Sequence, residues 1–353
     1  MKKELGFEIS KNNGENLEEL ITLTKTYYSD SDIIKKNYLD WQYNNNPAGK
    51  PFLFTSREEI TKELSGQYLV IPIKFNVLKE EHLGTLSLNT LTSPKYQGRG
   101  LFTKMAKATY DDCEKQNAVI TIGFPNPNSY PGFVKKLDFE HLGDIPLMVK
   151  PLKYFNLIKS YLKKKKIKHG KKILLSTIKN KNIKEFDFKK DKEQYELFWN
   201  IIKSQYDVST NKDFKFLKWR YKDIPTREYK LYKYVENNKI KGIVIINSRQ
   251  VWGFNVGVIM DILITNDNIN VGEKLLKYIK TISKNSNLDF ITCLHSKSNE
   301  FKLLKSQGYY VLPQKILPQK IHFIVRINKK FKNFEIPLHL KNWKLTFGDY
   351  DIF

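Results

Sequence analysis

The stretch SPKYQGRGLFTKM, residues 93–105, places Gly98 and Gly100 on either side of one arginine, after a strand-like run and before a helix-like run. Glycine loses more backbone entropy on folding than other residues, so two glycines at one turn indicate either a close approach of a partner to this backbone or simply a tight turn. The first-turn N–H groups of the following helix have no partner inside the helix, and the helix dipole adds partial positive charge there. The stretch therefore predicts a binding site for an anionic group such as a phosphate.

The chain has 353 residues and a formal net charge of +24. This length favours two domains, and the content of 41% hydrophobic and 13% aromatic residues favours a folded protein with a sizeable core. The charge indicates a polyanionic partner, or it reflects a general use of lysine at polar positions, and composition alone leaves both open. No RNA-recognition or helix-turn-helix pattern appears, so we expect no specific nucleic-acid binding.

Cys113 and Cys293 are the only cysteines, and they are far apart in the sequence. Their positions indicate neither a disulfide framework nor a metal-ligand spacing, so we expect no metal. The N-terminal run MKKELGFEIS has no apolar region of the kind found in signal peptides, and no stretch approaches the length of a membrane span. We therefore expect a cytoplasmic protein.

An internal sequence repeat predicts a duplicated fold. The run YLDWQYNNNP, residues 38–47, recurs as FLKWRYKDIP, residues 216–225, with leucine, tryptophan, tyrosine and proline at the same spacing. Strand-like and helix-like runs also follow one another in the same order in both halves. The phosphate-type loop is not repeated, because the second half has only Gly272 where the first half has two glycines.

The loop resembles the pyrophosphate-binding loop of the GNAT acyltransferases, Gln/Arg-x-x-Gly-x-Gly/Ala. Its six positions here run from Lys95 to Gly100, with lysine in place of the usual first residue. The run FVKKLDFEHL is similar to the family's YxKLGF segment, with Asp138 in place of glycine. The segments DWQYNNNPAG (40–49) and GFPNPNSYPGFVKKLDF (123–139) are similar to GNAT proteins associated with bacterial surface-polysaccharide synthesis.

The resemblance implies an α/β (α+β) fold with two tandem GNAT-like domains, each a central mixed, mainly antiparallel sheet flanked by helices. We place the catalytic domain at residues 1–150, a basic connector at 151–180, the second GNAT-like domain at 181–330 and a C-terminal tail at 331–353. We predict that the tail docks on the first domain.

The same resemblance implies acetyl-CoA as co-substrate and a small primary amine as acceptor, with direct attack in a ternary complex. Loop N–H groups would hold the pyrophosphate, and backbone groups of a splayed strand would pair with the pantetheine. Two asparagines after the next buried strand bind cofactor or substrate, or only form a turn. The predicted cofactor-binding residues are Asn89, Thr90, Leu91, Lys95, Gln97, Gly98, Arg99, Gly100, Leu101, Phe102, Asn126 and Asn128.

Candidate catalytic groups lie in two places. The family often carries a tyrosine that acts as the acid toward the thiolate, and Tyr130 stands one helical turn before that position. We therefore predict Tyr130 as the proton donor to the thiolate. The tail ends in two carboxylates, Asp349 and Asp351, and the α-carboxylate of Phe353. We predict that one of these three groups acts as base. His82 and His141 are expected to be structural.

The resemblance points to an amino sugar of a surface-polysaccharide precursor as the acceptor. Two alternatives stay open: an aminoacyl-tRNA-dependent ligase of peptidoglycan, which shares the duplicated fold, and a non-catalytic scaffold at a membrane. Residues 154–172 combine apolar residues at helical spacing with a lysine cluster. Such a segment contacts the anionic inner face of a membrane, or it is a solvated linker.

Overall fold

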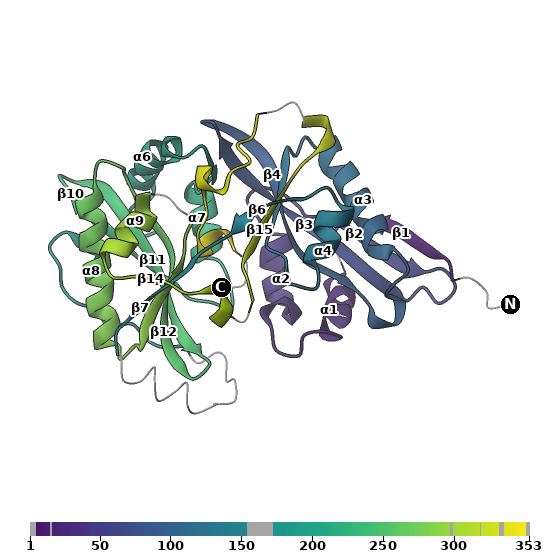
Figure 1. Cartoon of the computed structure of the whole chain (residues 1–353), viewed down its shortest axis with the longest axis horizontal. Helices are drawn as coiled ribbons and strands as arrows, with labels where there is room; N and C mark the ends of the chain where they lie inside the picture. Colours follow the sequence, from purple (N-terminus) through teal and green to yellow (C-terminus); the bar gives the residue numbers. More distant parts are fainter. Residues whose placement is uncertain are drawn as a thin grey trace. The chain divides into compact units, whose positions relative to one another are not determined.

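The computed structural model describes residues 5–14, 16–153, 172–296, 299–317, 319–331 and 335–350. They form two compact units, each containing a β-sheet (Figure 1). The first unit is drawn from residues up to 143 together with 223–227 and 321–336, and the second from 144–222, 228–320 and 337 onward.

The first unit contains a mixed sheet with the strand order β1-β2-β3-β4-β5-β15-β6. Strands β1 to β4 pair antiparallel, β4 and β5 pair parallel, and β5 and β15 pair antiparallel. Its elements are β1 (Phe7–Lys11), α1 (Leu17–Lys25), α2 (Lys36–Tyr43), β2 (Phe52–Glu58), β3 (Leu64–Val77), β4 (Glu80–Thr92), α3 (Leu101–Lys115), β5 (Ile120–Gly123), α4 (Tyr130–Lys136), β6 (Glu140–Asp144) and β15 (His322–Ile327).

The second unit contains a mixed sheet with the order β14-β7-β13-β12-β11-β10-β8, in which β12 and β13 are the parallel pair. Both sheets are therefore mixed and mainly antiparallel, which confirms the predicted fold class. Its elements are β7 (Leu147–Pro151), β8 (Ile183–Glu185), α6 (Lys192–Ile202), β9 (Val208–Thr210), α7 (Phe214–Tyr221), β10 (Lys230–Glu236), β11 (Lys239–Val251), β12 (Phe254–Ile264), α8 (Ile269–Asn285), β13 (Phe290–Leu294), α9 (Asn299–Ser306), β14 (Tyr310–Val311) and β16 (Trp343–Lys344).

The two halves of the sequence exchange a strand. β7 comes from the first half and pairs with β13, whereas β15 comes from the second half and pairs with β5 (Figure 1). The run DFEHLGDIPLMV, residues 138–149, has the alternation of a strand but contains β6 and the start of β7, with Pro146 between them. Proline has no N–H for a strand ladder, so pairing stops there. The units consequently differ from the predicted ranges 1–150 and 181–330.

Packing in the first unit explains why β15 belongs there. Tyr68, Met105 and Tyr110 of β3 and α3 share one buried cluster with Ile324 of β15. The guanidinium of Arg326 also lies over the Tyr110 ring, with its carbon 4.2 Å from the ring centroid. Burial of these apolar side chains supplies the main stabilising free energy of the unit.

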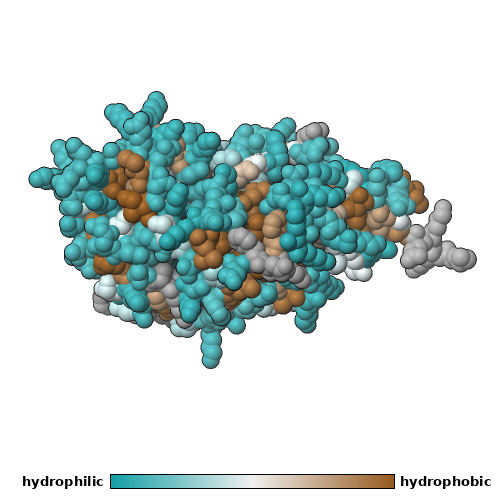
Figure 2. All heavy atoms as spheres, turned by 90° about the horizontal axis from the view of Figure 1, so that it is seen from above, coloured by the Kyte–Doolittle hydropathy of each residue, from teal (hydrophilic) through white to brown (hydrophobic). Residues whose placement is uncertain are grey.

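The surface is dominated by polar side chains. Figure 2 shows hydrophilic residues over most of the face in view, with smaller hydrophobic patches between them. Among the described residues, no helix is both long and apolar enough to cross a membrane. Residues 154–171, which hold most of the segment predicted to contact a membrane, lie outside the described residues.

The strand exchange leads to a test with Ile324→Ala. We expect a loss of about 2–5 kcal/mol in the free energy of unfolding, because the side chain is fully buried. Hydrogen exchange should quicken in β5 and α3, although the substitution lies near the end of the chain. Faster exchange confined to β12 and β13 would contradict the pairing described here.

Candidate functional site

The glycine loop has the backbone that the sequence predicts for an anion site. Gly98 and Gly100 have φ angles of 77° and 72°, in the left-handed region that favours glycine, and α3 begins at Leu101. A side chain added at either glycine would meet no atom within 4 Å, so the space beside the backbone is open. Within the described part of the chain, the N–H groups of residues 98–100 donate to no backbone acceptor. Five successive N–H groups, from Gly98 to Phe102, are therefore suited to an anion.

The side chains of the loop are held by neighbours in the first unit. Lys95 forms an ion pair with Glu63, which also accepts a hydrogen bond from the Tyr96 hydroxyl at 2.7 Å. The hydrogen bond from Lys95 lowers the pKa of the Glu63 carboxyl. Gln97 donates to the Tyr27 hydroxyl at 2.5 Å. Because its charge is already paired, Lys95 contributes less to an anion site than the sequence suggests.

An open strand edge lies directly before this loop. The parallel ladder between β4 and β5 ends at the pair Ser87 and Gly123, whereas β4 continues to Thr92. In the described part of the chain, β4 pairs only with β3 and β5. The side of residues 88–92 that faces away from β3 therefore carries backbone groups without a strand partner; we call this the first open edge. It includes the predicted residues Asn89, Thr90 and Leu91.

A β-bulge shapes the first open edge. Between β3 and β4, Gln67 pairs with Leu91 and Leu69 with Leu88, so β4 has one extra residue. Asn89 lies in the bulge with a φ of 49°. Asparagine tolerates this left-handed conformation better than most residues.

The carboxamide of Asn89 is anchored from helix α2. Its Nδ2 donates to Gln42 Oε1 at 2.9 Å and to the Tyr43 hydroxyl at 3.0 Å. The Gln67 Nε2 donates to the Asn89 carbonyl at 2.7 Å. Sequence reasoning assigned only backbone contacts to Asn89 and missed this anchoring. The signal for it was the recurring Trp-x-Tyr motif, whose tyrosine is Tyr43.

The two predicted asparagines after β5 differ. Asn126 Oδ1 accepts hydrogen bonds from the N–H groups of Asn128 and Ser129, both at 3.0 Å, and so forms the turn that leads into α4. This oxygen is therefore engaged in turn structure, while the side chain of Asn128 is exposed. Cofactor binding by either residue stays a prediction.

Tyr130, the predicted proton donor, lies among two imidazoles at the start of α4. Its ring centroid is 4.5 Å from that of His322 and 5.4 Å from that of His141. Nothing in the sequence singled out His322, because a lone histidine in a distant strand has no local pattern. Tyr130 and both histidines belong to the first unit.

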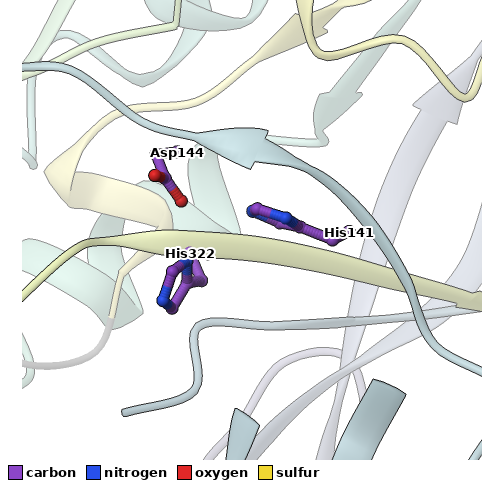
Figure 3. Close-up of side chains that lie close together, drawn as sticks. All are labelled: His141, Asp144 and His322. Atoms are coloured by element: carbon purple, nitrogen blue, oxygen red, sulfur yellow. The ribbon is translucent and has the colours of Figure 1, made fainter. Parts of the chain in front are cut away.

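His141, His322 and Asp144 are the one group of candidate metal ligands found among the described residues (Figure 3). One ligand atom from each lies within 4.8 Å of the others. Imidazole and carboxylate ligands suit zinc and similar ions. Asp144 also accepts a hydrogen bond from Gln314 at 2.9 Å, which gives the carboxylate a structural role without a metal.

The second unit has a similar open edge, but the chain itself covers it. The parallel ladder of β12 and β13 ends at Ile259 and Cys293. Beyond it, residues 343–350, which we call the C-terminal segment, lie against the end of β13. His295 bridges to Thr346, and the N–H of Ser296 donates to the Leu345 carbonyl at 3.0 Å.

A buried ionic cluster fixes the C-terminal segment. Lys212 Nζ lies 2.6 Å from Asp261 Oδ1 of β12 and 3.2 Å from Asp349. At Gly348, an added Cβ would lie 2.2 Å from Asp261 Oδ2, so only glycine fits. Gly272, the second-half counterpart suggested for the loop glycines, lies inside α8 and packs against Leu303 and Ile264.

These contacts differ from the predicted docking of the tail on the first domain, because residues 337–350 belong to the second unit. The prediction followed a resemblance and had no packing information. Asp349 is buried in the second unit beside a lysine. Asp351 and Phe353 lie outside the described residues, so their catalytic roles stay predictions.

Comparisons with known proteins agree with this fold. A family model described as an acetyltransferase (GNAT) domain matches residues 8–142. A probable N-acyltransferase of unknown function from Enterococcus faecalis is 13% identical, with a TM-score of 0.64 over 93% of this chain and 74% of that chain. A comparison with curated proteins found no match.

Two further solved structures are similar. Saccharomyces cerevisiae N-myristoyltransferase with bound myristoyl-CoA is 14% identical, with a TM-score of 0.62 over 91% of this chain and 82% of that chain. A GCN5-related N-acetyltransferase from Anabaena variabilis is 14% identical, with a TM-score of 0.63 over 92% of this chain and 74% of that chain. These likenesses show a shared mixed α/β fold across most of the chain.

The buried cluster predicts the effect of Asp349→Ala. Removing this carboxylate leaves Lys212 less compensated in a buried place, and we expect a loss on the order of 3 kcal/mol in the free energy of unfolding. Urea denaturation measures it. As a control, Asp111→Ala removes a solvent-exposed ion pair with Lys107 and should change stability by less than about 1 kcal/mol. Equal effects of the two substitutions would contradict the role given to Asp349.

His295 predicts a pH dependence of the second unit. Burial, followed by the charge of Lys344, lowers the pKa of His295 to about 4. His295 is therefore neutral in the folded protein at pH values where the unfolded chain binds a proton. The stability that it contributes is present above pH 6.5 and falls toward pH 4, by roughly 3 kcal/mol in total. Denaturant midpoints measured across this range should fall less steeply for His295→Gln; an unchanged slope would contradict the assignment.

Proposed function

We propose that the protein is an acyl-CoA-dependent N-acyltransferase whose first unit binds the acyl-CoA and catalyses transfer to an amine. The observation that carries the proposal is the continuity of the first open edge with the glycine loop. Residues 88–92 present backbone groups without a strand partner, and residues 98–102 present N–H groups a few residues later. A ligand with an amide-containing arm and a diphosphate matches this order of sites.

The loop is suited to the diphosphate. The space beside Gly98 and Gly100 is open, and the dipole of the 15-residue helix α3 favours an anion at its first N–H groups. Arg99 adds a positive charge next to these groups. The affinity of the loop should depend on the glycines, because a side chain would fill the space that the phosphate needs.

The first open edge is suited to the pantetheine arm and the thioester. Backbone N–H and C=O groups near Asn89, Thr90 and Leu91 would pair with the amides of the arm, as an added strand does. A backbone N–H at the bulge would donate to the carbonyl oxygen as negative charge develops on it. The protein would thus hold the thioester in place and stabilise the oxyanion.

The chemical step is then a direct attack. The amine nitrogen forms a bond to the thioester carbon, the C–S bond breaks, and the thiolate takes a proton from the Tyr130 hydroxyl. The attacking amine loses a proton to a base. The carboxylates of Asp351 and Phe353 are the groups that we propose for it, directly or through a water molecule. The proton that the base takes up is released to solvent, and the Tyr130 phenolate regains one from solvent.

We propose acetyl-CoA as the donor and an amino sugar of a surface-polysaccharide precursor as the acceptor. The support is the resemblance of residues 40–49 and 123–139 to proteins of that pathway class. An aminoacyl-tRNA-dependent ligase is disfavoured because it does not generally need the two-glycine loop. A scaffold that keeps the CoA site without turnover is the remaining alternative.

Calorimetry with acetyl-CoA tests the proposal. We expect one molecule bound per chain, and binding lost in Gly100→Trp because the indole would occupy the phosphate position. The matched control is Gly308→Trp. Gly308 also has a positive φ, 79°, and open space around it, but it lies in the second unit, so this variant should suffer similar backbone strain and keep binding.

The possible outcomes distinguish the enzyme from the scaffold. Binding together with acetyl-CoA consumption in the presence of amino sugars or polyamines supports the enzyme, and binding without any consumption supports the scaffold. No binding by the wild-type protein, or equal loss in both glycine variants, would overturn the assignment of the loop.

A further inference from the structure

We propose that the side-chain oxygen of Asn89 binds the attacking amine in its neutral form. This inference rests on the proposed function, because it concerns the same site. It assigns a role to the Asn89 side chain in addition to the predicted backbone contacts.

The first step is the orientation of the Asn89 carboxamide. Its Nδ2 donates to both Gln42 and Tyr43, so the amide cannot rotate without losing two hydrogen bonds. In the described part of the chain, its Oδ1 accepts no hydrogen bond, and the residue is only half-buried. Asn89 therefore presents a fixed acceptor at the first open edge. An N–H group is the natural partner for such an oxygen.

The side-chain amide of Gln67, beside the bulge, also has an oxygen without a donor. Gln67 uses its Nε2 to donate to the Asn89 carbonyl, and its Oε1 has no partner among the described residues although the side chain is almost fully buried. A buried acceptor without a donor is costly unless a bound group satisfies it. Two side-chain acceptors at the bulge, Asn89 Oδ1 and Gln67 Oε1, thus have no donor among the described residues, as expected where an amine binds.

The second unit has a residue, Asp261, at the position that corresponds to Asn89. The parallel ladders end at Ser87 and Ile259, and Asn89 and Asp261 each lie two residues later, next to a β-bulge. Both side chains also contact the tyrosine of a Trp-x-Tyr helix, Tyr43 or Tyr221. Asn89 and Asp261 are therefore equivalent.

At Asp261 the partner is a primary ammonium group. Lys212 Nζ lies 2.6 Å from Asp261 Oδ1. Lys212 comes seven residues before Trp219, and the residue seven before Trp41 is Ile34. The first unit therefore has no lysine at that place, and a substrate amine can take the position that Lys212 fills in the second unit.

The first unit has a carboxamide, Asn89, where the second unit has a carboxylate, Asp261, and this difference suits catalysis. Burial opposes the charge of Lys212, but Asp261 outweighs it and raises the pKa of the lysine. An ammonium cannot attack a thioester, because its nitrogen has no lone pair. A neutral asparagine holds the amine without stabilising its protonated form.

Two substitutions and a matched control test the inference by steady-state kinetics. A panel of amino sugars and polyamines is first screened with the wild-type protein, and the amine that supports the fastest consumption of acetyl-CoA is used as the substrate. Asn89→Ala should raise KM for the amine about tenfold. Asn89→Asp should move the pH dependence of kcat upward by about one unit, because the carboxylate stabilises the ammonium. Asn238→Asp should match wild type, since Asn238 also has a left-handed backbone, with a φ of 57°, but lies in the turn between β10 and β11 of the second unit.

Calorimetry separates this inference from the proposed function. Acetyl-CoA affinity is measured for each variant, because the backbone of residue 89 borders the proposed pantetheine site. Asn89→Asp keeps the shape of the side chain, so a change in KM for the amine or in the pH profile that exceeds its change in acetyl-CoA affinity supports the inference. If the variants bind acetyl-CoA normally and neither KM for the amine nor the pH profile changes, the inference is overturned while the proposed function stands.

A binding measurement without turnover completes the test. Crystals soaked with 4-bromoaniline, a primary amine that is neutral near pH 7 and retains its bromine, should show anomalous bromine signal beside Asn89, and Asn89→Leu crystals should not. Bromine bound only elsewhere, or bound equally in both crystals, would overturn the inference even if no amine of the panel is acetylated.

Discussion

The structure depends on one constraint: two parallel strands that separate leave backbone N–H and C=O groups without partners, and these groups must find others. This happens once in each unit, after β4 and β5 and after β12 and β13. In the second unit, residues 343–350 of the same chain lie at the opening. In the first unit, the opening leads into a glycine loop and a helix N-terminus. The difference between the two units is thus the difference between a filled site and one available to a ligand.

The repeated Trp-x-Tyr motif is explained by this need to support the backbone where the parallel strands separate. In each unit the tyrosine of this motif contacts the polar residue of the bulge, Tyr43 with Asn89 and Tyr221 with Asp261. A bulge needs such support because its extra residue makes no ladder hydrogen bond. The repeated motif therefore marks the helix that braces the opening. The adjoining position, Gln42 or Arg220, has diverged: glutamine contacts Asn89, whereas Arg220 donates to the carbonyls of the C-terminal segment.

Features set by local sequence could be predicted. The loop conformation at Gly98 and Gly100 follows from glycine and a helix start, and the duplicated fold follows from the sequence repeat between 38–47 and 216–225. Strand exchange could not be predicted, because apolar alternation does not say which sheet a strand joins. The same applies to the C-terminal segment, whose apolar residues indicate docking but not the surface.

The site was predicted in outline and missed in detail. Lys95 looked like a free charge, but Glu63 lies 32 positions away in the sequence and neutralises it in the fold. His322 reaches Tyr130 only because of the exchanged strand β15. The partners of Asn89 come from α2 and β3, and only the three-dimensional structure brings them to the bulge. Contacts between distant segments thus determine the chemistry that the loop alone could not specify.

A crystal structure of the protein grown with coenzyme A tests the central claim most directly. The account predicts the diphosphate at the N–H groups of residues 98–102 and the pantetheine arm along residues 88–92, with residues 343–350 still in place at the second opening. Coenzyme A bound at β12 in place of those residues, or an empty loop in crystals that contain the ligand elsewhere, would contradict it.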